Sequence, residues 1–374
     1  MISRWLAGLL AAIVLLTNAS AAHVLSDEAT AALWTVGPGD ELYAAFGHSA
    51  LRITDPVIGF DRIYNFGTFD FATPNFYLKF IHGDLDYYLT AAIAPEIIEE
   101  YRDHHQLVVE QQLNLTPAEL DQLFLAMESN LQPGNAAYRY DFVRDNCTTR
   151  IRDAVAKVAK VQWQPLASNS PTLREMVQPY VADRPAIQTG INLLFGANMD
   201  HPATSQEAMF LPEDMKLAFD RATINDGRRL VRSTQILLDG PKLPAPVTNW
   251  LVLGTYLAAV LAMVALIRNS RWPLWLDVIL FILTALIGCA IAFVWFGTRH
   301  WVLHDNWNLL WAWPTHLIIW FFPQRIRRKY WIAYAVFVLA AALWIPLQLT
   351  FVGVKLLLAF RALKMDAPSR TNQR

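Results

Sequence analysis

Hydrophobic and polar positions are distributed differently in the two halves of this 374-residue chain. Residues 23–245 mix short apolar stretches with charged positions, as globular domains do. From residue 250 onward the apolar positions join into runs long enough to cross a bilayer. The pattern therefore predicts a globular unit followed by a helical membrane unit.

Alternating apolar and polar positions predict strands in the globular unit. Residues 46–53 alternate, turn residues follow at 55–59, and residues 62–66 return, which together predict a β-hairpin. We expect further strands over residues 83–89, 107–115 and 235–238.

Helical periodicity and capping residues predict the helices. Thr116 and Thr172 each open a capping box with a glutamate three residues later. Asn146 is a good N-cap, so Cys147 is expected in the first turn of a helix. We expect the remaining helices over residues 26–35, 76–81, 95–103 and 212–222.

Four apolar spans are expected after the linker, over residues 250–267, 274–296, 307–322 and 330–348, with a marginal fifth over 349–363. Basic residues follow the first span and precede the fourth. By the positive-inside rule, both basic loops belong to the cytoplasmic side. The 298–306 loop is then expected on the same side as the globular unit.

The N-terminus indicates export from the cytoplasm. Arg4, an apolar run over residues 5–16 and an Ala-Ser-Ala site ending at Ala21 form a secretory signal. The net charge of −1 gives no indication of a nucleic-acid partner.

Cysteine usage directs attention to Cys147. The chain has two cysteines, and Cys289 lies in an apolar span, so the two are not expected to form a disulfide. A lone thiol in an oxidising compartment is a liability unless it is buried or does chemistry. Near the positive end of a helix, the thiolate is favoured. The alternative is that Cys147 is a small buried core residue.

A cysteine nucleophile needs a base and a group that orients the base. His48 is expected mid-strand after Gly47, and Asn65 on the partner strand is the nearest orienting group. The alternatives are an ordinary sheet histidine and a strand-end asparagine. No HExxH or CxxC spacing occurs, so neither a metal nor a cofactor is expected.

Four motifs in this order resemble the Lnb N-terminal periplasmic domain family, named for the Bacteroides-type lipoprotein N-acyltransferase. They are Gly47–Ile53 (GHSALRI), Tyr64–Phe71 (YNFGTFDF), Asn75–Phe80 (NFYLKF) and Asp145–Arg150 (DNCTTR). The Trp301–Pro314 stretch is similar to the membrane part of full-length members.

The resemblance implies a fold and an activity. The fold class is an α+β permuted papain-like (NlpC/P60-like) periplasmic domain plus an α-helical multi-span membrane domain. Cys147 would be the nucleophile and His48 its base, while Asn65 as third member comes from the hairpin geometry. The implied reaction moves an acyl chain from phospholipid through a Cys147 thioester to the N-terminal amine of lipoproteins, at the bacterial inner membrane.

Two other functions remain open from the sequence. The same residues would serve a cysteine peptidase or amidase that acts on cell-wall peptides, and a sensor or scaffold would use no chemistry at all.

Candidate substrate-binding residues are Arg52, Tyr64, Arg150, His304 and Asn306. Arg150 either anchors a phosphate headgroup or belongs to a solvated helix face. The 298–306 loop, with flanking tryptophans at headgroup level, is either part of the active site or an ordinary polar turn.

The expected domain boundaries follow from these assignments. They are a signal peptide over 1–21, a periplasmic domain over 22–239, a linker over 240–249, a membrane domain over 250–363 and a cytoplasmic tail over 364–374.

Overall fold

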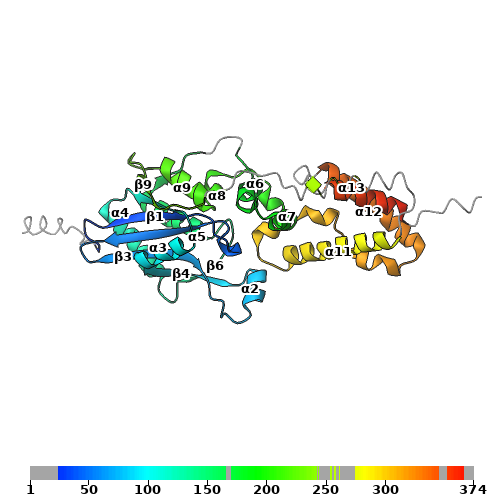
Figure 1. Ribbon diagram of the computed structural model, residues 1–374, viewed down its shortest axis with the longest axis horizontal. Helices are drawn as coiled ribbons and strands as arrows, with labels where there is room; N and C mark the ends of the chain where they lie inside the picture. The colour runs from blue at the N-terminus through cyan, green and yellow to red at the C-terminus, as the bar shows by residue number, and fades with distance from the viewer. Residues whose placement is uncertain are drawn as a thin grey trace, which may run out of the picture.

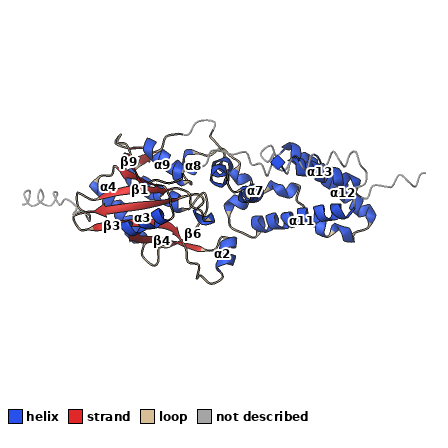
Figure 2. Cartoon of the chain, viewed as in Figure 1, coloured by secondary structure: helices blue, strands red, loops and turns tan. Residues whose placement is uncertain are grey.

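The computed structural model describes residues 24–165, 170–241, 243, 253–254, 257, 261, 274–344 and 352–365. It has a sheet-containing unit at one end and a purely helical unit at the other (Figure 1, Figure 2). The α+β unit and the helical C-terminal region were both predicted and are confirmed. The predicted signal peptide lies outside the described residues, as does nearly all of the first predicted span.

Among the described residues, seven strands form one antiparallel sheet. In spatial order they are β6 (Ala137–Arg139), β4 (Asp86–Ile93), β3 (Phe60–Thr68), β2 (His48–Asp55), β1 (Thr30–Val36), β5 (Val108–Leu113) and β9 (Val231–Leu238). The predicted hairpin is β2–β3, in which Leu51 is paired with Tyr64. His48 and Asn65, two of the predicted catalytic residues, therefore lie on inner strands of the sheet.

The helix predicted over residues 26–35 is wrong, because this segment contains strand β1. β1 pairs with β2 on one side and with β5 on the other. Its side chains are buried on both faces of the sheet, with Leu33 in one core and Trp34 in the other. A strand buried on both faces shows no alternation, and its Ala-Ala-Leu sequence has high helix propensity.

Eight α-helices are found in the described part of the globular unit. They are α2 (Phe76–His82), α3 (Ala94–Asp103), α4 (Pro117–Asn130), α5 (Cys147–Ala159), α6 (Leu173–Val177), α7 (Pro185–Leu194), α8 (Ser205–Ala208) and α9 (Pro212–Arg221). The helices predicted from the caps at Thr116, Asn146 and Thr172 are confirmed, and each cap accepts hydrogen bonds from the first turn.

Short elements complete the globular unit. They are the small ladder of β7 (Val161–Gln162) with β8 (Thr223–Ile224), and the 3-10 turns η1 (Leu42–Ala44), η2 (Gln178–Val181) and η3 (Ala197–Met199).

The sheet has a hydrophobic core on each face. Ile151 and Val155 of α5 pack with Leu51 and Tyr64, and α4 and α9 join them on this face. On the other face, α3 covers Ile63 together with Trp34 and Ala50. Helix α5 is thus fixed against β2 and β3, which carry His48 and Asn65.

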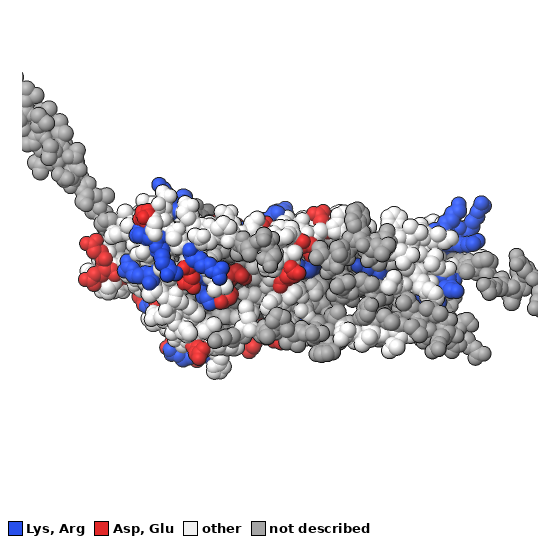
Figure 3. Space-filling view, turned by 90° about the horizontal axis from the view of Figure 1, so that it is seen from above, with Lys and Arg blue, Asp and Glu red and all other residues white. Residues whose placement is uncertain are grey.

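The helical unit contains α11 (Leu274–Phe296), α12 (Gln324–Trp344) and α13 (Val352–Lys364). Among the described residues, α11 is the one helix long and apolar enough to cross a membrane, judged by length and composition. Lys and Arg side chains gather at the end of this unit farthest from the sheet, where the basic residues 325–329 open α12 (Figure 3). The basic end of the helical unit and the sheet-containing unit therefore lie at opposite ends of α11.

The span predicted over residues 307–322 is wrong as a continuous helix. The chain forms four 3-10 turns after α11: η4 (Trp301–Leu303), η5 (Trp307–Leu310), η6 (Pro314–Leu317) and η7 (Ile319–Phe321). Pro314 opens η6, where its missing N–H would break a longer helix. Asn306 caps η5 with its side chain, which also favours a new start over a continuous span.

Candidate active site

Asn146 holds the N-terminus of α5 in place. Its side-chain oxygen accepts hydrogen bonds from the N–H groups of Thr148 and Thr149, each 2.9 Å long. Its amide nitrogen donates to the carbonyl oxygens of Phe142 (2.8 Å) and Phe210 (2.9 Å). The residue is buried, so every polar atom of its side chain is used. Cys147 is therefore presented in one fixed orientation at the first helical position.

The thiol of Cys147 is buried and activated. Burial alone raises its pKa, but attraction to His48 and a hydrogen bond with that side chain lower it. The backbone N–H of Ser49 and the hydroxyl of Thr148 also stabilise the thiolate, and the pKa falls from 9.0 to about 7. A thiol with this pKa is substantially ionised at neutral pH.

His48 responds to the same contact in the opposite direction. Burial lowers its pKa, but the neighbouring Cys147 and a hydrogen bond to Asn65 raise it above its ordinary value. Its Nε2 lies 3.1 Å from the side-chain oxygen of Asn65. That bond engages Nε2 and leaves Nδ1 for the thiol. The structure thus brings the three predicted residues together as thiol, imidazole and orienting amide.

Two glycines beside the site have a left-handed backbone. Gly47 has φ +76°, and a Cβ there would lie 2.5 Å from the carbonyl oxygen of Val36. Gly67 has φ +95° where β3 shifts register, and a Cβ there would lie 3.6 Å from the Cβ of Cys147. The left-handed backbone favours glycine at both positions, and at Gly47 the carbonyl oxygen of Val36 also leaves no room for a Cβ.

Two predicted substrate-binding residues are engaged elsewhere on the strands. The guanidinium of Arg52 pairs with Asp61 (2.7 Å) and Glu110 (2.9 Å). The hydroxyl of the buried Tyr64 donates to Glu128 over 2.6 Å. A role for Arg52 and Tyr64 in substrate binding stays a prediction.

Arg150, one turn into α5, is held close to the site. Its guanidinium pairs with Asp145 at 2.6 Å and stacks 3.6 Å from the ring centroid of Tyr138. The ion pair and the stacking support the Asp145–Asn146 turn before the nucleophile. Its role as a headgroup anchor stays a prediction.

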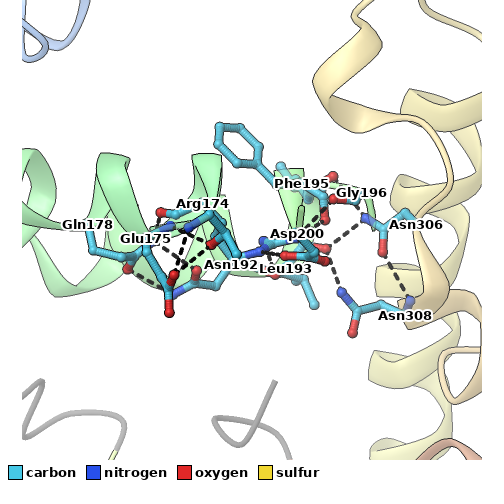
Figure 4. Close-up of polar contacts among 12 residues, drawn as sticks. Arg174, Glu175, Gln178, Asn192, Leu193, Phe195, Gly196, Asp200, Asn306 and Asn308 are labelled. Carbon is cyan, nitrogen blue, oxygen red and sulfur yellow. Dashed lines mark hydrogen bonds and ion pairs between the residues drawn. The ribbon is translucent and has the colours of Figure 1, made fainter. Parts of the chain in front are cut away.

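The predicted loop residues His304 and Asn306 lie at the junction of the two units. His304 Nε2 is 3.0 Å from the carbonyl oxygen of Thr298, within the loop itself. The amide of Asn306 donates to the carbonyl oxygens of Leu193 and Leu194 at the end of α7, over 2.9 and 2.8 Å (Figure 4). These are terminal helix carbonyls that lack partners within α7.

Sequence reasoning missed other residues of this junction. Asn308 also donates to the carbonyl oxygen of Leu193, and Arg144 stacks 3.7 Å from the ring centroid of Trp301. Arg144 precedes Cys147 by three residues, so the loop contacts the segment that leads into α5. The tryptophan and asparagine residues of this loop were the signal in the sequence that it makes specific contacts. The partners of these residues became known only from the folded chain.

A thiol–histidine pair on a sheet-based unit, joined to an apolar helical unit, is typical of a membrane-anchored protein with a candidate nucleophilic cysteine. Two family models match the chain: the Lnb N-terminal periplasmic domain over residues 17–178 and the Lnb transmembrane domain over residues 241–364. The chain belongs to the Lnb family, and is a membrane protein with a periplasmic domain. No curated protein and no solved structure matches it.

Proposed function

We propose that this protein is a cysteine-dependent lipoprotein N-acyltransferase, a multi-pass protein of the bacterial inner membrane with its catalytic domain in the periplasm. It would move an acyl chain from phospholipid through a Cys147 thioester to the N-terminal amine of lipoproteins. The observation that carries the proposal is the thiol pKa of about 7 beside His48, in a domain joined to a transmembrane domain. Both proposed substrates, the phospholipid and the lipoprotein, would be at the surface of the same membrane.

The order of the site residues supports a permuted papain-like, NlpC/P60-like fold for the periplasmic domain. The strand that carries His48 precedes the helix that carries Cys147, and that helix packs on β2 and β3. Ordinary papain-like enzymes have the cysteine first. The imidazole of His48 nevertheless contacts both the thiol and the amide of Asn65, as such a site requires.

In the first half-reaction, the thiolate of Cys147 attacks the ester carbonyl carbon of the phospholipid. The C–O ester bond breaks, and the leaving alkoxide takes the proton of the His48 imidazolium. The products are a thioester on Cys147, a lysophospholipid and a neutral imidazole. The N-terminus of α5 stabilises the negative charge that develops on the carbonyl oxygen.

In the second half-reaction, the lipoprotein amine attacks the thioester carbonyl. An amide bond forms as the C–S bond breaks, and the imidazole of His48 accepts the proton that the amine loses. The thiolate and the imidazolium are thereby restored. The hydrogen bond that Nε2 of His48 donates to the side-chain oxygen of Asn65 keeps Nδ1 of His48 directed at the reacting atoms through both steps.

The two cysteines provide a matched pair of variants for the test. The full chain is reconstituted in phospholipid vesicles, and peptides containing Cys147 are analysed by mass spectrometry for an acyl adduct. A lipoprotein with a free N-terminal amine is then added, and its acylation is followed. We expect both signals with Cys289→Ala and neither with Cys147→Ala.

The same preparation distinguishes the other functions. Absence of an acyl adduct together with release of peptides from isolated sacculi, without lipid, would identify a cell-wall peptidase or amidase instead. Full function of the Cys147→Ala variant in cells would identify a sensor or scaffold. Either result overturns the proposed transfer.

A further inference from the structure

Helix α2 presents apolar side chains to solvent on a scale that is unusual for a water-facing helix. Tyr77 is 75% exposed and Leu78 is 60% exposed, and Phe80 and Ile81 are also exposed. Phe71, just before the helix, is 65% exposed and packs 4.9 Å from Phe76. We call the set Phe71, Phe76, Tyr77, Leu78, Phe80 and Ile81 the α2 apolar surface.

The α2 apolar surface adjoins the end of α11, the helix suited to span the bilayer. The ring of His82 lies 5.8 Å from that of Phe293, and the carbonyl oxygen of His82 accepts a hydrogen bond from the N–H of Arg299. His300 Nε2 lies 2.9 Å from the carbonyl oxygen of Phe80. Figure 1 shows α2 projecting from the sheet unit near the end of α11 that faces this unit. The apolar surface thus continues the apolar surface of α11.

The charge on α2 fits the boundary of a membrane. Lys79 is the one Lys, Arg, Asp or Glu within the helix. A lysine beside exposed aromatic rings matches a phospholipid headgroup layer, where the ammonium meets phosphate and the rings lie at the acyl boundary.

We propose that the α2 apolar surface inserts into the outer leaflet of the membrane that α11 crosses. This docking holds the periplasmic domain against the lipid at a second point besides the 298–306 loop. It does not depend on the chemistry proposed for Cys147.

Aromatic rings connect this surface with the thiol. Phe76 lies 5.8 Å from Phe69, Phe69 lies 5.6 Å from Tyr87, and Tyr87 lies 4.7 Å from Tyr140, measured between ring centroids. Tyr140 is close enough to Cys147 for the thiolate charge to add to the rise in its pKa that burial causes. If the proposed acyl transfer operates, a chain drawn from the leaflet would reach Cys147 along these rings.

The test places a fluorescent probe on the α2 apolar surface. Leu78→Cys is labelled with an environment-sensitive nitrobenzoxadiazole dye in the full chain that carries Cys147→Ser and Cys289→Ala. A second position is Tyr77→Cys. Ile58→Cys is the matched control, because Ile58 is 64% exposed but lies in the β2–β3 turn, at the opposite end of the strands from His48.

Each labelled protein is reconstituted in phosphatidylethanolamine–phosphatidylglycerol vesicles that contain phospholipids with a nitroxide near the ester end of the acyl chain. We expect roughly half of the fluorescence at positions 78 and 77 to be quenched, because interfacial helices bury their apolar face to the acyl boundary. Position 58 should keep its signal.

Three results would overturn the proposal. The first is no quenching at positions 77 and 78, and the second is equal quenching at position 58. The third is shielding of position 78 from aqueous iodide without quenching by lipid, which would indicate a protein partner or a second copy. No acyl transfer is measured, so an inactive enzyme leaves the test intact.

Discussion

Reactivity at the site depends on one charge pair, between Cys147 and His48. The pKa of the thiol is lowered to about 7, so the thiolate persists down to that pH and is lost below it. His48→Ala removes the attraction and the hydrogen bond that lower the pKa, and leaves the burial that raises it. The alkylation profile should therefore move to higher pH, with the rate at pH 7 falling about tenfold or more.

The rate of iodoacetamide alkylation against pH measures this shift, with Cys289→Ala as the background so that Cys147 alone reacts. His104→Ala is the control, because His104 is an exposed residue at the end of α3. Its profile should overlay that of the parent. Unchanged rates in His48→Ala would remove His48 from the activation of the thiol.

At the scale of single residues, the sequence was sufficient to place three polar groups together. Cys147 was identified by its cap and the secretory signal, and His48 and Asn65 by their positions on one hairpin. The sequence could not show that Arg52 is bound by Asp61 and Glu110, since Glu110 lies on a distant strand. Which nitrogen of His48 faces the thiol also became clear only from the bond to Asn65.

Helix α5 should depend on its cap more than other helices of the domain do. Asn146→Ala removes two cap bonds to N–H groups and leaves the part-buried carbonyl of Phe142 and the buried carbonyl of Phe210 without their donor. The first loss costs about 1 kcal/mol of stability, and the second about 1–3 kcal/mol more. Thr116→Ala removes only a surface cap from α4, so about 1 kcal/mol is expected.

Thermal unfolding of the full chain in detergent compares the two variants, and Asn146→Ala should have clearly the lower midpoint. Asn146→Asp tests the electrostatic part. It keeps the acceptor for the helix but adds a negative charge beside the thiol, so the alkylation profile of Cys147 should move to higher pH. Equal midpoints for the two alanine variants would show that Asn146 is an ordinary cap.

At the scale of elements, the sequence predicted those helices and strands that are determined by nearby residues, such as caps and turns. The capped helices α4, α5 and α6 and the hairpin β2–β3 are as expected from their sequences. β1 was missed because its burial between β2 and β5 is a property of the whole sheet. The segment 307–322 was missed because its apolar composition suggested a span, while Pro314 and the Asn306 cap divide it into 3-10 turns.

At the scale of the whole molecule, the described parts of the two units meet closely at the end of α7. Asn306 and Asn308 bind the end of α7 from the membrane side, while Arg174 binds the carbonyl oxygens of Phe195 and Gly196 from the periplasmic side (Figure 4). Arg174 is itself held by Asp200. The sequence predicted that the 298–306 loop lies on the periplasmic side, but not that it contacts α7.

This junction should fix where the thiol sits relative to the membrane, and two glycines test the idea. A Cβ at Gly196 would lie 1.5 Å from the carbonyl oxygen of His304, whereas a Cβ at Gly190, in α7, would meet nothing within 4 Å. Gly196→Ala must therefore push the loop away from α7, where the N–H of Gly196 now donates to Val302 over 2.8 Å. Gly190→Ala should leave the junction unchanged, or stabilise the protein slightly because alanine favours a helix.

We expect Gly196→Ala to lower the proposed acyl transfer from vesicle phospholipid about tenfold or more, because displacing the reacting groups by an ångström already has effects of that order. Alkylation of Cys147 by iodoacetamide should stay at the parent rate, since the groups that activate the thiol all lie within the periplasmic domain. Hydrogen exchange should rise in residues 193–200 and 300–306 of Gly196→Ala and stay unchanged in Gly190→Ala. Faster exchange at the junction with undiminished transfer would mean that the two units work without being held at a fixed distance.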